Sequence, residues 1–411
     1  MEKTNWRRTR LACYYTNITM ASAFSLPAML FTTFHGTYGI SYTLLGTLVL
    51  VNFFTQMLVD LVLTFFGRRF NIKLLLRCIP LLTSAGLLLY AAAPVVFPGF
   101  TFVGLLAGTV VFSLAAGCCE VLISPVIAAL PSDDPGRDLS LLHSLYGYGV
   151  LLVVAISALY FQLFGTENWT YLVVFFGLLP LAGMVMLLRS PLPEVELGGK
   201  KSETQAKKYR GELAFCAVLI FFGAIAECTM TNWVCLYLEK GLNLPKAASD
   251  VLGLAVFAAL LAMTRTLYSK RGGNISRILG WSMVGGVSCY LVAGLAMNPV
   301  VAAVACVLTG LCTAMMWPGT LILMEQKIPR PGVAAYALMA TFGDFGGAAG
   351  PQLLGAAVDA TAVTDWANAL AQKLSMTAEQ VALKASMLMG AGLLAIGFIC
   401  LAIWRKVRDR A

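Results

Sequence analysis

Charged residues are scarce in this chain of 411 residues. Only 12% of the residues are Asp, Glu, Lys or Arg, about half the share of an average soluble domain, whereas 59% are apolar. So few charges cannot cover the surface of a water-soluble protein of this size. Disorder is excluded as well, because it requires low hydrophobicity and high charge. The composition therefore indicates a protein whose solvent is mostly lipid.

Motifs that carry enzymatic chemistry are missing. The sequence has no GxSxG, HExxH or Walker A motif, and its two histidines, His35 and His143, have no nucleophile at a useful spacing. Its 11 cysteines lie in or beside apolar runs and form no metal-type pairs. We therefore expect no enzymatic activity, no metal and no cofactor. Without a phosphate-binding loop, the sequence also excludes nucleotide hydrolysis as a driving force.

Long apolar runs dominate the sequence. A membrane-spanning helix needs about 20 apolar residues, and charges and Pro/Gly breaks separate twelve runs of at least this length. The first is expected to be a retained helix, since no small-residue cleavage site follows it. The runs cover residues 11–34, 41–66, 74–96, 101–130, 139–164, 169–189, 211–238, 248–268, 277–297, 299–326, 331–358 and 382–404. They predict an all-α integral membrane protein with 12 transmembrane helices.

Basic residues gather in alternate connections between these runs. The two termini and the connections after the second, fourth, sixth, eighth and tenth runs hold 25 of the 29 Lys and Arg residues. Cytoplasmic loops of membrane proteins collect basic residues, so both termini are predicted to be cytoplasmic. The same rule explains the net charge of +9 without a nucleic-acid partner.

A polar segment at residues 190–210 divides the runs into two sets of six. We therefore expect an N-terminal six-helix bundle at 1–189, a cytoplasmic linker at 190–210 and a C-terminal six-helix bundle at 211–411. A short repeat supports the division, because Asn71-Ile72 recurs as Asn274-Ile275, 203 residues later. This arrangement resembles the major facilitator superfamily, in which the binding site lies between two such halves near mid-bilayer.

Acidic residues inside the apolar runs require an explanation, because each costs about 2.5–3.5 kcal/mol or more at membrane depth. Glu120 lies in the middle of the fourth run, Glu227 in the seventh and Asp344 in a glycine-rich part of the eleventh. We predict that these three couple the solute to a proton. The alternative for Glu120 is a neutral carboxyl that hydrogen-bonds between helices, and Asp344 could instead act in gating or line the substrate path.

Other polar residues in the runs are candidates for a binding cavity. Asn232 and Trp233 follow Glu227, and an amide and an indole beside a carboxylate suit a sugar or polyol. Asn52 and Gln56 belong to a polar stripe that cannot face lipid. The complete set of candidates for substrate binding is Asn52, Gln56, His143, Tyr146, Asn232, Trp233, Trp317 and Gln352.

A third group of charges is assigned to gating or structure. It comprises Asp60, Arg68, Arg69, Arg265 and Glu325. For Asp60, a structural role and substrate contact both remain open. Arg265 could pair with Asp60, Glu325 or Asp344, and the sequence does not choose among them. Trp317-Pro318-Gly319 is expected to break the tenth run at mid-depth.

Segment 117–149 resembles the fucose–galactose–glucose proton symporter branch of the superfamily. In that branch a Glu is followed by small residues and Pro, then by a Leu-rich helix start with Gln, Phe, Asn and Gly. The matching residues here are Glu120, Pro125, Leu139, Leu141, His143, Leu145, Tyr146 and Gly149. His143 and Tyr146 replace the family's Gln and Asn, and Gly67-Arg68-Arg69 matches the end of the superfamily's loop motif. The resemblance implies that Glu120 is the carboxylate linked to the proton or the substrate.

Our leading hypothesis is a secondary transporter for a small polar solute, a sugar or polyol. It would sit as a monomer in the cytoplasmic membrane and work by alternating access, in symport with a proton or, alternatively, sodium. A second hypothesis is proton-driven efflux of amphipathic compounds, which the 17 Met and 23 Phe residues would suit. From another class, the chain could be a membrane sensor or scaffold that transports nothing.

Overall fold

The computed structural model describes residues 6–131, 135–195, 209–328 and 332–408, and within these ranges the chain is helical with short connections. Among these described residues, ten segments are long and apolar enough to cross a membrane. The first and eleventh expected runs form two long helices that are not among these ten. They are α1 (Trp6–Tyr38) and α14 (Gly332–Ala362). The fold is therefore that of a multi-pass helical membrane protein. The count of twelve spans and the cytoplasmic termini remain predictions.

Internal contacts divide the chain into two units. Unit 1 contains the chain up to Leu30 and from Val51 to the end of α6, and unit 2 contains Phe31–Leu50 and everything from α8 onward. The end of α1 and the beginning of α2 thus group with the C-terminal helices. The expected boundaries at 1–189, 190–210 and 211–411 stay a prediction.

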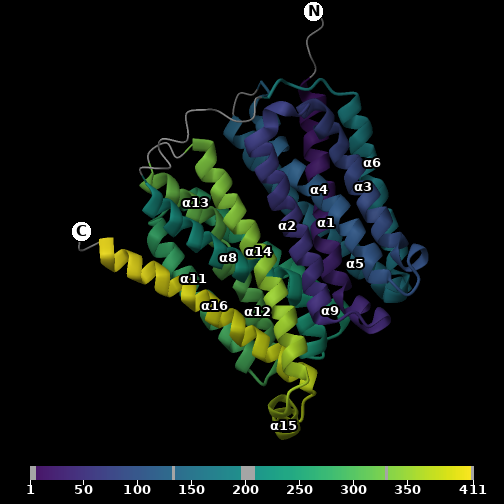
Figure 1. The fold of residues 1–411 in the computed structure, drawn as a ribbon, viewed down its shortest axis with the longest axis vertical. Coiled ribbons are helices and arrows are strands. Elements are labelled where there is room, and N and C mark those ends of the chain that lie inside the picture. The colour runs from purple at the N-terminus through teal and green to yellow at the C-terminus, as the bar shows by residue number, and fades with distance from the viewer. Residues whose placement is uncertain (1–5, 132–134, 196–208, 329–331, 409–411) are drawn as a thin grey trace, which may run out of the picture. The chain divides into compact units, whose positions relative to one another are not determined.

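Unit 1 is built around the packing of α3 against α4 and α6, which are labelled in Figure 1. A Cβ at Gly86 of α3 would lie 2.4 Å from the backbone nitrogen of Phe112 on α4, so only glycine allows this approach. The elements of the N-terminal part are α1 (Trp6–Tyr38), α2 (Tyr42–Phe66), η1 (Gly67–Arg69), α3 (Ile72–Val96), α4 (Thr101–Ala128), α5 (Pro135–Phe164), η2 (Thr166–Asn168) and α6 (Trp169–Leu188).

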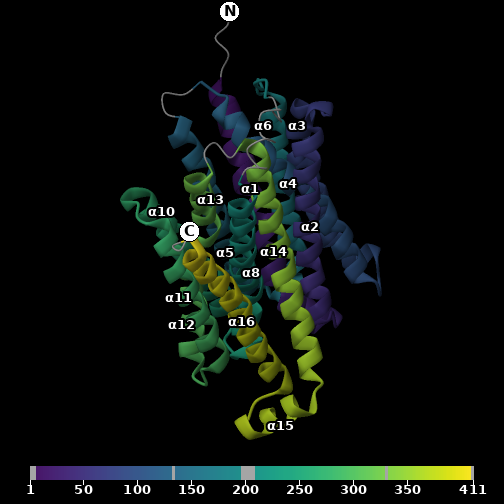
Figure 2. The ribbon, with the colours of Figure 1, turned by 60° about the vertical axis from the view of Figure 1, so that its left-hand side comes forward.

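In unit 2, α8 packs against α14 and α16, while α11 packs against α12 and α16 (Figures 1 and 2). Two short π-helical segments, η3 and η4, interrupt the α8–α10 region. The elements are α8 (Arg210–Leu236), η3 (Tyr237–Gly241), α9 (Lys246–Asp250), η4 (Val251–Val256), α10 (Phe257–Arg271), α11 (Ile275–Leu295), α12 (Pro299–Thr313), α13 (Met316–Lys327), α14 (Gly332–Ala362), α15 (Asp365–Leu374) and α16 (Ala378–Arg408).

The tenth expected run is broken, but slightly earlier than predicted. The helix is interrupted at Ala314 and Met315, and Pro318 already lies in the first turn of α13. A proline is tolerated there because the first N–H groups of a helix have no intrahelical acceptor. The break therefore precedes Pro318 instead of lying on it.

The repeated Asn-Ile pair marks the same structural event in each half. The Asn71 Oδ1 accepts a hydrogen bond of 3.1 Å from the backbone N–H of Leu74 and caps α3. The Asn274 Oδ1 accepts one of 3.0 Å from the backbone N–H of Arg277 and caps α11. The backbone angles of the two asparagines also agree closely. The repeat is therefore a shared helix start.

Loss of either cap has a measurable cost. Replacing Asn71 or Asn274 with Ala is expected to destabilise its helix start by about 1 kcal/mol, because an N-cap acceptor is removed. Hydrogen exchange should accelerate at Leu74 in the first variant and at Arg277 in the second. The Asp variants keep the acceptor and should retain protection. Equal exchange in the Ala and Asp variants would contradict the assignment.

Candidate functional site

Arg265 of α10 joins three elements of unit 2. Its Nη2 donates to both carboxylate oxygens of Glu227 on α8, at 3.0 and 3.2 Å. Its Nε donates to the backbone carbonyl of Ala314, at the break between α12 and α13, at 2.9 Å. The Arg265 side chain is 39% exposed and that of Glu227 is 18% exposed. The pair is thus partly open to the surroundings and not sealed in the core.

The acceptor at Ala314 exists because of a proline four residues later. In a continuous helix the N–H of residue 318 would bond to the carbonyl of Ala314, but Pro318 has no N–H. The carbonyl is left without its usual donor, and the guanidinium supplies one. The expected role of Trp317-Pro318-Gly319 as a simple kink therefore extends to holding Arg265 in place.

The sequence-based expectation for the partner of Arg265 was wrong. It offered Asp60, Glu325 or Asp344, whereas the structure pairs the guanidinium with Glu227. Glu325 is exposed and accepts a hydrogen bond from the hydroxyl of Tyr336. Asp60 and Asp344 are both buried, in α2 and α14. Glu227 is the acid that lies on the face of α8 within reach of the guanidinium.

Three polar atoms on α8 and α14 are buried with no hydrogen-bond partner among the described residues. They are the Nε1 of Trp233, the Oγ1 of Thr229 and the Oε1 of Gln352. Trp233 is fully buried, and Thr229 lies one turn before it on the same face of α8. Such atoms are costly unless something satisfies them, so they are candidate contacts for a solute. Sequence reasoning missed Thr229, although its spacing of four from Trp233 was readable.

Neighbouring candidates in unit 2 are placed differently. Asn232 donates its side-chain amide to the carbonyl of Cys228 on its own helix, at 2.8 Å. Trp317 packs its ring against Gly343 of α14, where a Cβ would lie 2.3 Å from the indole. Asp344 is the next residue and is 3% exposed. Trp317 thus contacts α14 at the residue that precedes Asp344.

In unit 1 the predicted polar stripe forms a buried network. The Asn52 Oδ1 accepts from the Nε2 of Gln56 at 2.9 Å and from the Oγ of Ser113 on α4 at 2.6 Å. The network ties α2 to α4, and Ser113 was not among the predicted residues.

This network should contribute measurably to stability. Replacing Asn52 with Leu removes the acceptor that Gln56 and Ser113 share, and stranding buried polar groups should cost about 1–3 kcal/mol. The measurement is the thermal unfolding midpoint of the purified protein. A midpoint unchanged from wild type would contradict this role.

Glu120 is exposed at the surface of unit 1, although it lies in the second half of α4. Tyr146 of α5 meets Phe24 of α1 edge to face, with ring centroids 5.8 Å apart. The guanidinium of Arg69 lies over the ring of Phe66 at 5.4 Å. The side chains of His143 and Arg68 lie outside the part of the chain that the structure describes.

A close contact within unit 2 joins the beginning of α2 to α14. We call it the α2–α14 seam and define it by residues 42–46 and 351–359. The carboxylate of Asp359 accepts hydrogen bonds from the backbone N–H groups of Tyr42 at 3.2 Å and Thr43 at 2.6 Å. A Cβ at Gly355 would lie 2.2 Å from the Tyr42 carbonyl oxygen. The sequence analysis did not anticipate this seam.

Ionisable groups surround the seam. The Tyr42 ring stacks on His35 with centroids 4.2 Å apart, and its hydroxyl bonds to Glu379 of α16. The Nε2 of His35 lies 3.6 Å from the same carboxylate.

Elsewhere in unit 2, the Nζ of Lys246 lies 2.6 Å from Asp250 and 3.8 Å from Glu239. Lys246, which falls outside the basic connections, is thus neutralised by two acids.

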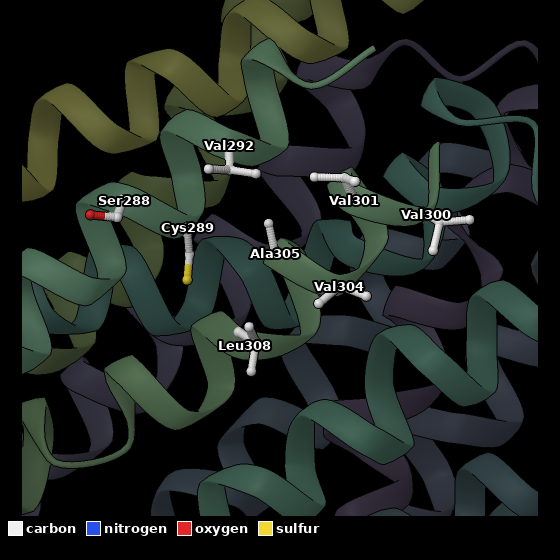
Figure 3. Close-up of a pocket in the computed structure, with 8 residues that line it drawn as sticks. All are labelled: Ser288, Cys289, Val292, Val300, Val301, Val304, Ala305 and Leu308. Carbon is white, nitrogen blue, oxygen red and sulfur yellow. The ribbon is translucent and has the colours of Figure 1, made fainter. Parts of the chain in front are cut away.

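The groove between α11 and α12 has different chemistry from the polar groups above. It has a volume of about 330 Å³ and is shown in Figure 3. Its lining residues are Ser288, Cys289, Val292, Val300, Val301, Val304, Ala305 and Leu308. The hydroxyl of Ser288 bonds to the carbonyl of Val284 on its own helix. The groove therefore offers apolar contacts and does not suit a polar solute.

Comparisons with known proteins identify the family. The family model described as Major Facilitator Superfamily matches residues 11–351. A bacterial homologue of the human lysosomal transporter Spinster has a similar structure, with a TM-score of 0.76 and 14% identity over 99% of this chain and 98% of that one. The structure of a point mutant of the nucleoside transporter NupG has a TM-score of 0.70 and 13% identity, over 96% of this chain and 99% of that one.

A D-xylose-proton symporter gives a TM-score of 0.69 and 14% identity over 94% of this chain and 97% of that one. Curated protein sequences gave no match. The structural likenesses establish the fold, and the family model covers most of the sequence. The chain therefore belongs to the Major Facilitator Superfamily and is a multi-pass membrane transporter.

Proposed function

We propose that this transporter moves a small polar solute, a sugar or polyol, across the cytoplasmic membrane in symport with a proton. It does so by alternating access, in which the solute is exposed to one side of the membrane and then to the other. The observation that carries the proposal is the set of buried polar atoms on Thr229, Trp233 and Gln352 that find no hydrogen-bond partner in the described part of the chain. It includes an indole donor, an amide acceptor and a hydroxyl, which match the mixed donor and acceptor character of a polyhydroxylated solute.

Two similar structures have names that fit this solute class. One is a nucleoside transporter and another a D-xylose-proton symporter, and both carry hydroxylated solutes by name. Their identities of 13% and 14% support only the fold, so the solute class rests on this chain's own residues.

Binding can be tested on purified protein. Sugars, polyols and nucleosides are screened for an increase in the thermal unfolding midpoint, since a ligand that binds the folded state stabilises it. With a solute that binds, Trp233→Phe keeps an aromatic ring but removes the N–H and should weaken binding about tenfold, equivalent to one lost hydrogen bond. Trp281→Phe changes an exposed tryptophan on α11 and serves as the matched control. Equal affinity in both variants would exclude Trp233 from the site.

Coupling is assigned to Glu120, with Glu227 and Asp344 as further candidate carboxylates. Glu120→Gln should abolish accumulation of the solute against its gradient in proteoliposomes but spare exchange at equal concentrations. The amide binds similarly but cannot release a proton. Glu167→Gln, at an exposed acid of η2, is the control. Continued accumulation by Glu120→Gln under a pH gradient would overturn the assignment, and dependence on sodium instead of pH would identify the other ion.

A further inference from the structure

The connection between α14 and α16 contains a discrete helix of its own. α15 spans Asp365–Leu374, ten residues that are too few to cross a bilayer. The Oγ1 of Thr364 accepts a hydrogen bond from the N–H of Ala367 and caps its beginning. Ser375, with a φ of 54°, ends it in the left-handed conformation. The sequence specifies both ends, so α15 is a defined element and not an irregular loop.

The two faces of α15 differ sharply. Ala367 and Ala371 are buried and form a small apolar cluster with Val381 of α16, against which Met376 packs. On the adjoining face, about 100° around the helix axis, Trp366 is 52% and Leu370 36% exposed. The two residues are four apart and therefore share one face of the helix. Val363, just before the helix and three residues from Trp366, is 79% exposed.

The position of α15 brings this exposed face close to the bilayer. Figure 2 shows α15 at the ends of α14 and α16, with its axis across theirs, and Figure 1 shows it at the same ends. The candidate membrane span of α16 begins at Ala378. Only Ser375, Met376 and Thr377 separate it from α15, a reach of about 14 Å at most at 3.3–3.6 Å per residue. The short connection therefore keeps α15 within this distance of the candidate span of α16.

We propose that α15 is an interfacial helix that inserts Trp366 and Leu370 at the boundary between headgroups and acyl chains. An exposed Trp–Leu pair on a short amphipathic helix is typical of this position, and tryptophan favours the interface because its ring is apolar and its N–H is polar. Lys373, three residues after Leu370, lies on the same side and places its ammonium among lipid phosphates. The occupant of the exposed face is thus lipid, continuous with the lipid that surrounds α16.

The proposal is tested on the full-length protein in phosphatidylcholine nanodiscs by tryptophan fluorescence. The difference between wild type and Trp366→Phe isolates the emission of Trp366. Phosphatidylcholine brominated close to the glycerol backbone should quench most of this emission, and bromines near the chain ends should quench less. Aqueous iodide should have little effect. The corresponding difference for Trp169→Phe, a buried tryptophan of α6, is the control and should respond weakly to all three.

Leu370→Asp provides a second test. It places a charge on the exposed face without touching the Ala367–Ala371–Val381 cluster, so folding is preserved. Iodide quenching of Trp366 should rise severalfold and bromolipid quenching should fall. Strong iodide quenching of the wild-type residue would show that the face lies in water, and quenching by neither reagent would show that protein covers it. Either result overturns the proposal, and neither bears on the solute or the proton.

Discussion

Replacing Arg265 with Leu is expected to destabilise the protein by roughly 2–3 kcal/mol. The change leaves the Glu227 carboxylate without its counter-charge and the Ala314 carbonyl without its donor. Removal of one partner from a buried ion pair typically costs about 3–5 kcal/mol. The expected loss for Arg265→Leu is smaller than this range because the Arg265 side chain is 39% exposed, so solvent screens part of its charge. The thermal unfolding midpoint and the denaturant midpoint should both fall.

Companion variants separate the contributions of charge and geometry. Arg265→Lys keeps the positive charge, but an ammonium lacks the planar set of donors with which the guanidinium reaches both Glu227 oxygens and the Ala314 carbonyl. Its loss of stability should therefore be intermediate. In Glu227→Gln/Arg265→Leu no stranded charge remains, and part of the stability should return. Arg271→Leu, at an exposed residue of α10, is the matched control. The pair would be energetically irrelevant if Arg265→Leu and Arg271→Leu had equal midpoints.

The positions of the long helices could be predicted from the sequence because one physical requirement dominates them. In lipid every backbone group must bond internally, so an apolar run of sufficient length becomes a helix. The runs at 74–96 and 277–297 correspond to α3 and α11, and the asparagine that precedes each helix also caps it. Local signals of this kind act within one or two turns, where the sequence is directly informative.

The pairing of side chains depended on information that the sequence does not carry locally. Glu227 and Arg265 were both recognised as charges that need a reason, but their pairing depends on how α8 and α10 are rotated towards each other. The link from Pro318 to Ala314 is different. It follows from the four-residue helix hydrogen bond and could have been derived before the structure.

The α2–α14 seam shows a further limit of the sequence analysis. Asp359 lies one residue beyond the predicted run 331–358, so it was not recognised as a membrane charge. Its partners are backbone N–H groups more than 300 residues away, and a backbone donor has no sequence signature. Gly46 and Gly355 were likewise unremarkable among 38 glycines. A Cβ at Gly46 would lie 2.9 Å from the backbone carbonyl oxygen of Pro351 on α14. Only the close packing of α2 on α14 explains why these two positions need glycine.

Gly355→Ala is expected to have a large effect for a substitution of one methyl group. The added Cβ would lie 2.2 Å from the carbonyl oxygen and 2.8 Å from the carbonyl carbon of Tyr42. These are backbone atoms, so the start of α2 must move away from α14. Overpacking of this kind costs about 1–3 kcal/mol, which outweighs the gain of about 0.5–1 kcal/mol from replacing a helical glycine with alanine. We expect a lower unfolding midpoint.

Gly392→Ala on α16 is the matched control, since among the described residues no atom beyond its own stretch of helix lies within 4 Å of the Cβ that it would add. It keeps the gain in helix propensity without the clash, so its midpoint should rise slightly while that of Gly355→Ala falls. Displacement of α2 should also lengthen the hydrogen bonds to Asp359, so amide exchange at Tyr42 and Thr43 should accelerate only in Gly355→Ala. If both glycine variants were stabilised with unchanged exchange, the close contact between α2 and α14 would be refuted.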